Sequence, residues 1–132
     1  MNPSALYLTA QDYRLVNQLL VGPTGKNVTI DRLRAELARA VVLEPSAVPA
    51  AAVGLNSLVR FEDLGSREEE EYQVTLPADA DPDQRRISVL SPIGAALLGY
   101  CAGQEIEWPT PGGLRRLRIL RVRRETPVGA VA

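Results

Sequence analysis

The chain has 132 residues, no histidine, one cysteine and a formal net charge of −1 at pH 7. This length fits one ordinary domain, or a small domain with an appendage. The near-neutral charge gives no global electrostatic case for nucleic-acid binding, and the lack of histidine excludes Ser-His and Cys-His nucleophile pairs and the usual zinc ligand sets. We therefore expect neither a metal site nor a cofactor.

Three features bear on where the protein works. No apolar run approaches the ~20 residues that span a bilayer, and the N-terminus lacks the basic and apolar parts of an export signal. Cys101 has no second cysteine to pair with, so we expect it to act as a small buried or half-buried hydrophobic residue. We expect a cytoplasmic protein with no membrane partner, and a monomer, because nothing in the sequence demands more.

Two amphipathic helices are predicted near the N-terminus. The first covers about residues 10–20 and begins at Thr9, which has the spacing of a capping box with Asp12. The second carries apolar residues at helical spacing: Ile30, Leu33, Leu37 and Val41. A Gly/Pro-rich turn joins them, which predicts a short antiparallel helical hairpin over residues 1–45. Each helix is near the marginal length for an isolated helix and must pack on its neighbour or on the body.

The tip of this hairpin offers Thr24, Lys26 and Asn27, and it has no carboxylate. The segment Gly22–Lys26 matches a phosphate-binding P-loop only in part. Leu20 stands where that loop needs glycine, and Asn27 stands where it needs Ser or Thr. A plain turn is therefore favoured over nucleotide binding.

The second part of the chain has strand periodicity. Two prolines within residues 44–56 disfavour a continuous helix, and we place a linker at 46–55. Period-two alternation then predicts strands at 58–63, 72–76, 87–90, 104–108 and after a turn at Pro111–Gly113. In the last strand the apolar residues change face near Ile119–Leu120. A bulge there would bring Leu117, Ile119, Leu120 and Val122 toward the core, and the alternative is a strand covered on both sides.

One short apolar helix is predicted at residues 92–98. Ser91 can cap its start, Pro92 suits its first position and Gly99 suits the residue after its end. The Pro111–Gly112 pair suits the corners of a type II turn.

Charged and aromatic residues in this part leave alternatives open. Arg115, Arg116 and Arg118 are a candidate contact for nucleic acid or an acidic protein, but pairing with Glu105 and Glu107 across strands is favoured. The run Glu68–Glu71 is interpreted as solvated rather than as a cation site. For Trp108 a core position is favoured over a role as a partner anchor.

Four segments together resemble a known family: Ile87–Gly99, Trp108–Gly113, Asn56–Leu64 and Pro77–Ala80. The first two resemble the C-terminal domain of bacterial Gre-type transcription factors. With the other two included, the chain resembles the nucleoside diphosphate kinase regulator family, short relatives of the Gre factors that act on RNA polymerase. The resemblance covers residues 55–124 well and residues 9–45 loosely.

This resemblance implies an α+β fold. The helical hairpin at 1–45 and the linker would be followed by an FKBP-like antiparallel sheet around one short helix at 56–126, and by a tail at 127–132. In Gre-type factors a loop equivalent to Leu90, Ser91 and Pro92 docks on the rim of the polymerase channel. These residues are therefore the predicted docking loop, although Leu90 stands where some relatives have an acidic residue. A structural interpretation stays open, because Ser-Pro is also what a helix start requires.

The function that the resemblance implies is a non-enzymatic regulator, which binds RNA polymerase near the secondary-channel entrance and competes with Gre factors. Gre-type cleavage factors hold a catalytic magnesium ion with acidic residues at the hairpin tip. This tip has no acidic residue, so we expect no transcript cleavage. We expect the protein to contact nucleic acid only within the polymerase complex. The alternative is regulation of nucleoside diphosphate kinase, direct or through gene expression. A third, disfavoured hypothesis is a prolyl isomerase on the FKBP-like scaffold, because fold does not imply activity and aromatic residues are few.

Overall fold

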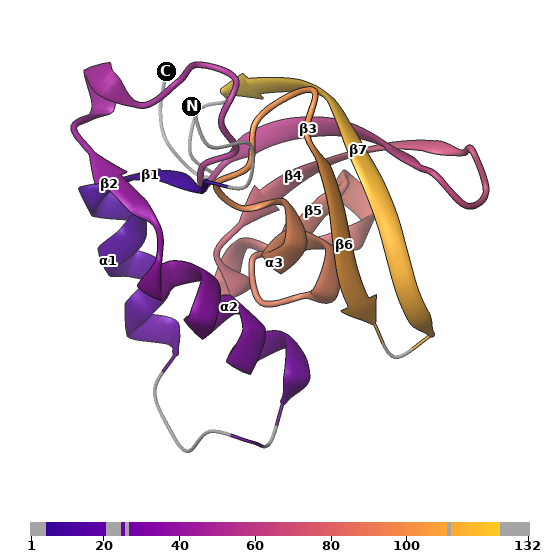
Figure 1. Ribbon diagram of the computed structural model, residues 1–132, viewed down its shortest axis with the longest axis horizontal. Coiled ribbons are helices and arrows are strands. Elements are labelled where there is room, and N and C mark those ends of the chain that lie inside the picture. Colours follow the sequence, from indigo (N-terminus) through magenta and orange to yellow (C-terminus); the bar gives the residue numbers. More distant parts are fainter. Residues whose placement is uncertain (1–4, 21–24, 26, 111, 125–132) are drawn as a thin grey trace.

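The computed structural model describes residues 5–20, 25, 27–110 and 112–124, which form an α+β fold with one larger and one smaller sheet (Figure 1). The α-helices are α1 (Ala10–Leu19), α2 (Val28–Ala38) and α3 (Pro92–Leu97). The strands are β1 (Tyr7–Thr9), β2 (Val41–Leu43), β3 (Ser57–Asp63), β4 (Glu69–Thr75), β5 (Arg86–Ser88), β6 (Glu105–Thr110) and β7 (Gly113–Arg124). Short 3₁₀ turns lie at Pro45–Ala47, Pro77–Asp79 and Pro82–Gln84. No helix in these ranges is long and apolar enough to cross a membrane.

The larger sheet is mixed, whereas the sequence predicts an antiparallel one. Its strand order is β5-β4-β3-β7-β6, and β5 runs parallel to β4 while the other neighbours are antiparallel. A tight hairpin can join only antiparallel strands, and a parallel neighbour needs a longer connection. The two proline-led 3₁₀ turns between β4 and β5 supply that connection.

The predicted bulge lies in β7, but only part of its expected effect occurs. Arg60 of β3 pairs with Arg121, and Phe61 pairs with Ile119, so Leu120 is the extra residue. Ile119 is fully buried, whereas Leu120 is 39% exposed. The prediction that Leu120 joins the core is therefore wrong, because the bulged residue itself is left without a cross-strand partner and turns to solvent.

Side chains cap all three helices in the same way. Thr9 Oγ1 accepts from Asp12 N, Asn27 Oδ1 from Ile30 N and Ser91 Oγ from Gly94 N, each at 3.1 Å. The capping roles of Thr9 and Ser91 are confirmed. Asn27 belongs to the predicted hairpin tip, and its observed role is to start α2.

The second helix is shorter than the sequence pattern predicts. It ends at Ala38, and Val41 belongs to β2, where its N–H donates to Leu6 O at 2.8 Å. Strands β1 and β2 form a two-stranded parallel sheet. Tyr7 N, on the other edge of β1, donates to Gly99 O at 2.9 Å and joins this small sheet to the body. Pairing with a distant strand therefore takes Val41 out of the helical stripe.

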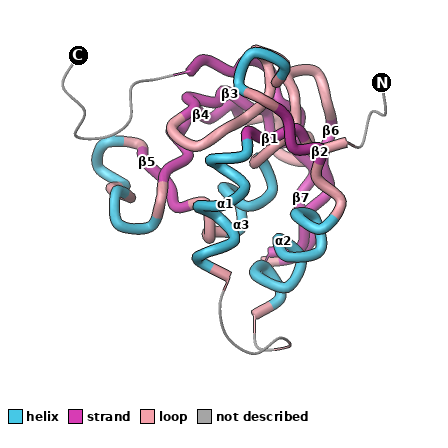
Figure 2. Tube along the Cα trace, turned by 90° about the vertical axis from the view of Figure 1, so that its left-hand side faces the viewer, coloured by secondary structure: helices cyan, strands magenta, loops and turns pink. Residues whose placement is uncertain are grey.

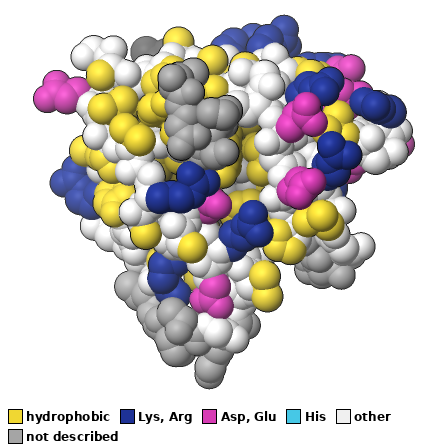
Figure 3. Space-filling view, viewed as in Figure 1, with side chains coloured by type: hydrophobic (Ala, Val, Ile, Leu, Met, Phe, Trp, Pro, Cys, Tyr) yellow, Lys and Arg dark blue, Asp and Glu magenta, His cyan; other side chains and the backbone are white. Residues whose placement is uncertain are grey.

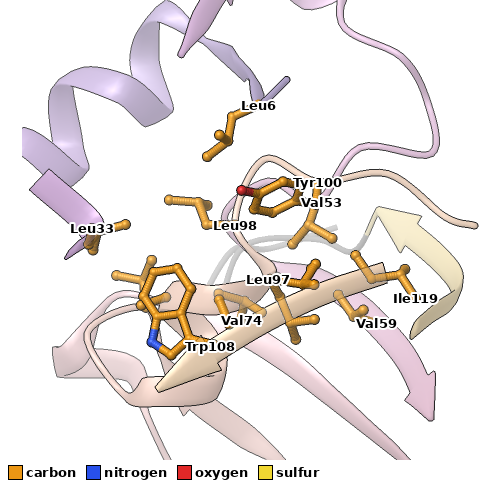
Figure 4. Packing of buried hydrophobic residues seen from close by; sticks show 14 of the residues in the cluster. Leu6, Leu33, Val53, Val59, Val74, Leu97, Leu98, Tyr100, Trp108 and Ile119 are labelled. Atoms are coloured by element: carbon orange, nitrogen blue, oxygen red, sulfur yellow. The ribbon is translucent and has the colours of Figure 1, made fainter. Parts of the chain in front are cut away.

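The helices and the larger sheet share one hydrophobic core (Figure 4). Leu33 of α2, Leu97 of α3 and Trp108 of β6 are each 1% exposed or less. Figure 2, which looks at the helical side, places α1 and α2 in front of the sheet with β5 at the left edge. Gly99 adopts φ +84°, and a Cβ there would lie 2.9 Å from Leu6 Cβ, so glycine is required where β1 meets α3.

Candidate partner-docking site

The predicted docking residues Ser91 and Pro92 lie at the start of α3, where they line an open depression of about 310 Å³. The other lining residues come from β4, β5, α3 and β7: Glu70, Tyr72, Ile87, Ile93 and Arg115. Most of this surface is apolar, and the charged groups stand at one side. Such a depression can receive an apolar side chain that has a polar neighbour.

The loop before α3 is held by its own hydrogen bonds. Ser91 Oγ accepts from Gly94 N and donates to Ser88 O at 2.6 Å, so one hydroxyl both caps α3 and closes the turn. A Cβ on Gly94 would lie 2.1 Å from Ser88 O, so no other residue fits without moving the backbone. Pro92 occupies the first helical turn, where its missing N–H costs nothing.

Leu90 does not line the depression. It is half-buried and packs against the hydrophobic core, and its N–H donates to Ser88 Oγ at 3.0 Å. Two of the three predicted docking residues are therefore brought together, and the third supports them from inside. An apolar side chain suits this inward position.

Arg115 forms the charged wall of the depression. Its Nε and Nη2 donate to Asp63 Oδ2 at 3.0 and 2.8 Å, and Nη2 lies 3.5 Å from Glu70 Oε2. The guanidinium, helped by N–H groups of Ser66 and Gly65, lowers the pKa of Asp63. Arg115 is thus neutralised by two carboxylates and fixed in place.

Tyr72 forms the aromatic wall. Its hydroxyl donates to Glu70 Oε1 at 3.4 Å and accepts from Arg85 Nη1 at 3.2 Å. The Arg85 guanidinium carbon lies 5.1 Å from the ring centroid, and the Phe61 ring stacks at 6.1 Å on the core side. These contacts hold the ring in one orientation.

Sequence reasoning did not include Glu70 and Tyr72 in the site. The sequence predicts Glu70 as part of the solvated run Glu68–Glu71, yet strand alternation places Glu70 and Tyr72 on the same face of β4. Their pairing with Phe61 and Val59 of β3 puts that face toward the core side of the sheet. Alternation was therefore the signal that could have found them.

Arg116 and Arg118 lie outside the depression, on strand β7, and pair with acidic side chains. Arg116 reaches Glu105 at 3.7 Å and Glu107 at 3.6 Å, and Arg118 reaches Glu105 at 3.1 Å. The predicted cross-strand pairing is confirmed. In the space-filling view basic and acidic side chains are interspersed over this part of the surface (Figure 3). Charges matched in this way do not form a uniformly basic strip.

Other predicted positions have mixed outcomes. Thr24, Lys26 and Pro111 lie outside the described residues. Trp108 is a core residue, 1% exposed, with the Arg32 guanidinium carbon 5.1 Å from its ring centroid. Cys101 is buried, and burial raises the pKa of its thiol, which confirms its packing role. Within the described ranges no group of three or more acidic or thiol side chains could hold a metal ion.

Comparisons with known proteins agree on one family. The family described as transcription elongation factor GreA/GreB, C-terminal, matches residues 48–124. The regulator of nucleoside diphosphate kinase of Escherichia coli K12 is 34% identical over 115 residues, which cover 86% of this chain and 85% of that protein. A solved structure, the transcription elongation factor GreA/GreB from Nitrosomonas europaea, superimposes with a TM-score of 0.71 at 41% identity, covering 90% of this chain and 98% of that one. The transcription elongation factor GreA of Clostridioides difficile is 37% identical over 86 residues, and the match spans 54% of its length.

Proposed function

The chain belongs to the GreA/GreB family of transcription elongation factors, and from this premise we propose that it is a non-enzymatic regulator of RNA polymerase. It binds the polymerase near the secondary-channel entrance, through the depression beside Ser91 and Pro92, and competes there with Gre-type factors. The sheet with α3 serves as an FKBP-like docking body, and α1 and α2 serve as a short helical prong.

One observation carries this proposal: Ser91 and Pro92 stand at the rim of a depression whose walls are already fixed. The Ser91 hydroxyl is held by Ser88 and Gly94, and the Arg115 guanidinium is held by Asp63. Binding to such a surface orders few side chains, which lowers the entropic cost of association. Pro92 offers the partner a rigid apolar ring.

The prong carries no cleavage chemistry. The segment Val21–Asn27 contains no Asp or Glu, and Mg²⁺ needs oxygen ligands of that kind. Helix α1 has 10 residues and is therefore roughly 15 Å long. The carboxylate of Asp31 in α2 accepts from Gly25 N at 2.8 Å and pairs with Arg34, so it is engaged in holding the turn. A short prong whose connecting segment has no carboxylate can dock in or block a channel.

The test is binding of the fluorescently labelled protein to bacterial core RNA polymerase, with an unlabelled Gre-type factor as competitor. Pro92→Ala removes the ring and keeps the helix start, so we expect roughly a ten-fold loss of affinity. Pro82→Ala is the matched control, since Pro82 also begins a helical turn and is exposed outside the depression. Equal affinity of both variants, or no competition, would refute the assigned docking site. No binding at micromolar concentration would refute the function.

A second candidate function is regulation of nucleoside diphosphate kinase. It is favoured by the similarity to the Escherichia coli protein of that name over 86% of this chain. A direct effect predicts a changed turnover when the purified kinase and this protein are mixed without polymerase. An unchanged turnover would leave only an indirect route through gene expression.

A further inference from the structure

Two charged side chains that line the depression beside α3 keep hydrogen-bonding capacity that the fold does not use. Arg115 donates to Asp63 through Nε and Nη2, and within the described ranges its Nη1 makes no hydrogen bond or ion pair. Glu70 accepts from the Tyr72 hydroxyl at 3.4 Å, and its other oxygen lies 3.5 Å from Arg115 Nη2. A carboxylate has about four acceptor positions, so Glu70 can accept from a partner while it keeps both contacts.

The charges on and behind the walls of the depression cancel. The carboxylates of Asp63 and Glu70 are matched by the guanidinium groups of Arg115 and of Arg85, which lies over the Tyr72 ring. An acidic partner group meets two carboxylates here, and a basic one meets two guanidinium groups. Either ion therefore gains little attraction for the water that it loses. The walls favour a partner group that is polar and uncharged.

The donor and the acceptor stand side by side, which selects among uncharged groups. Nη1 and Nη2 belong to one planar guanidinium, and Nη2 of Arg115 is 3.5 Å from Glu70 Oε2. The side-chain carboxamide of Asn or Gln carries its oxygen and its NH₂ group on one carbon, so it can face both residues at once. A trans peptide bond turns its C=O and N–H in opposite directions and can face only one of them.

We propose that the depression recognises a partner segment in which an Asn or Gln side chain stands beside an apolar side chain. The carboxamide oxygen accepts from Arg115 Nη1, its NH₂ group donates to Glu70, and the apolar side chain covers Pro92 and Ile93. The volume of about 310 Å³ is at the lower end of the roughly 300–1,000 Å³ of ligand sites, which suits one or two side chains. For the identity of the partner, the polymerase, this inference rests on the proposed function.

The first test uses small probes and no polymerase. Isovaleramide, isovalerate and isovaleramidine share one branched apolar group, and their planar head groups are uncharged, negative and positive. Each is titrated into the isotopically labelled protein while the NMR signals of the Ile87 and Ile93 methyl groups are followed. We expect isovaleramide to bind with a Kd of the order of 10 mM, and both ions to bind roughly three- to five-fold more weakly. Equal or tighter binding of either ion, or of isoamyl alcohol, would overturn the proposal. So would the absence of shifts with isovaleramide at ten times that concentration.

Glu70→Ala tests the assigned contact, and Glu71→Ala is its matched control. Glu71 is the next residue of β4, lies on the opposite face and pairs with Arg121 outside the depression. Glu70→Ala leaves Arg115 bonded to Asp63, so the circular dichroism spectra of both variants should match that of the wild type. In Glu70→Ala the depression has lost an acceptor and a negative charge, so isovalerate should bind more tightly than isovaleramide. The wild-type order of the two probes in Glu70→Ala would contradict the assigned contact.

The same two variants separate this inference from the proposed function. In the polymerase-binding assay Glu70→Ala should lose roughly five-fold in affinity, because a hydrogen bond to a partly exposed charged group is lost. Glu71→Ala should bind like the wild type. Equal affinity of the two variants, together with a loss in Pro92→Ala, would overturn the carboxamide contact and leave the function standing. Selective binding of isovaleramide without any binding of polymerase would refute the function and leave the chemistry of the site standing.

Discussion

Tyr100 connects the chain after α3 to helix α2, and its removal should weaken that connection. The hydroxyl donates to Glu36 Oε2 at 2.8 Å and accepts from Arg39 Nη2 at 2.9 Å. Tyr100 is 8% exposed, and the Glu36 side chain is 12% exposed. Glu36 and Arg39 also contact each other, so Tyr100→Phe leaves neither charge without a partner. We therefore expect a loss of about 1–2 kcal/mol in the free energy of unfolding at pH 7.

The effect should depend on pH in a defined direction. Burial, then the hydrogen bond and charge of Glu36, raise the pKa of Tyr100 from 10.0 to about 12. A group whose pKa is higher in the folded state stabilises it fully below the unfolded value and loses that contribution as pH rises through the folded value. The stabilisation is thus complete below pH 10 and lost toward pH 12.

Urea unfolding between pH 7 and pH 11.5 measures this difference. Trp108 is the single tryptophan and is buried, so its fluorescence reports unfolding. The advantage of wild type over Tyr100→Phe should shrink as pH rises above 10. Tyr7→Phe is the control, because it removes a phenol hydroxyl away from Glu36 and Arg39. An advantage that stays constant with pH would refute the reasoning.

Two further substitutions test local features. Asp63→Asn should destabilise the fold by about 1 kcal/mol at pH 7, because the charge that Arg115 faces is lost. The pKa of Asp63 is lowered, so its contribution to stability is present above pH 3.8 and disappears as pH falls through the folded-state pKa. The free energies of unfolding of the wild type and of Asp63→Asn should therefore converge in acid. Gly99→Ala should cost about 2–4 kcal/mol in thermal unfolding, since it combines a positive φ with a clash against Leu6. Gly103 has φ +91° and no atom within 4 Å of a Cβ, so Gly103→Ala should lose only the stability that the positive φ costs. An equal loss of stability in Gly99→Ala and Gly103→Ala would show that contact with Leu6 contributes nothing.

Local sequence signals determined where most elements begin and end. Thr9 and Ser91 cap helices, and Gly99 follows α3 with a positive φ, as their residue types predict. Alternation placed Trp108 in the core and located the bulge at Leu120. These features depend on contacts within a few residues or on one face of a single strand, so the sequence carries them directly.

The candidate site was predicted in part. Ser91 and Pro92 could be named because a short motif carries them. The residues that form the walls of the depression could not be predicted. Arg115 bonds to Asp63, which lies 52 positions away in the chain, and Glu70 comes from a third segment. No local pattern states which of several acidic residues a given arginine will face.

Only the tertiary structure decided the remaining features. The parallel placement of β5, the solvent position of Leu120 and the capture of Val41 by β1 each depend on a strand that is distant in the sequence. Propensity fixes whether a segment can extend or coil. Which neighbour it pairs with, and which of its edges stays open, is set by packing and hydrogen bonding of the whole chain, because backbone groups satisfied by one partner are no longer available to another.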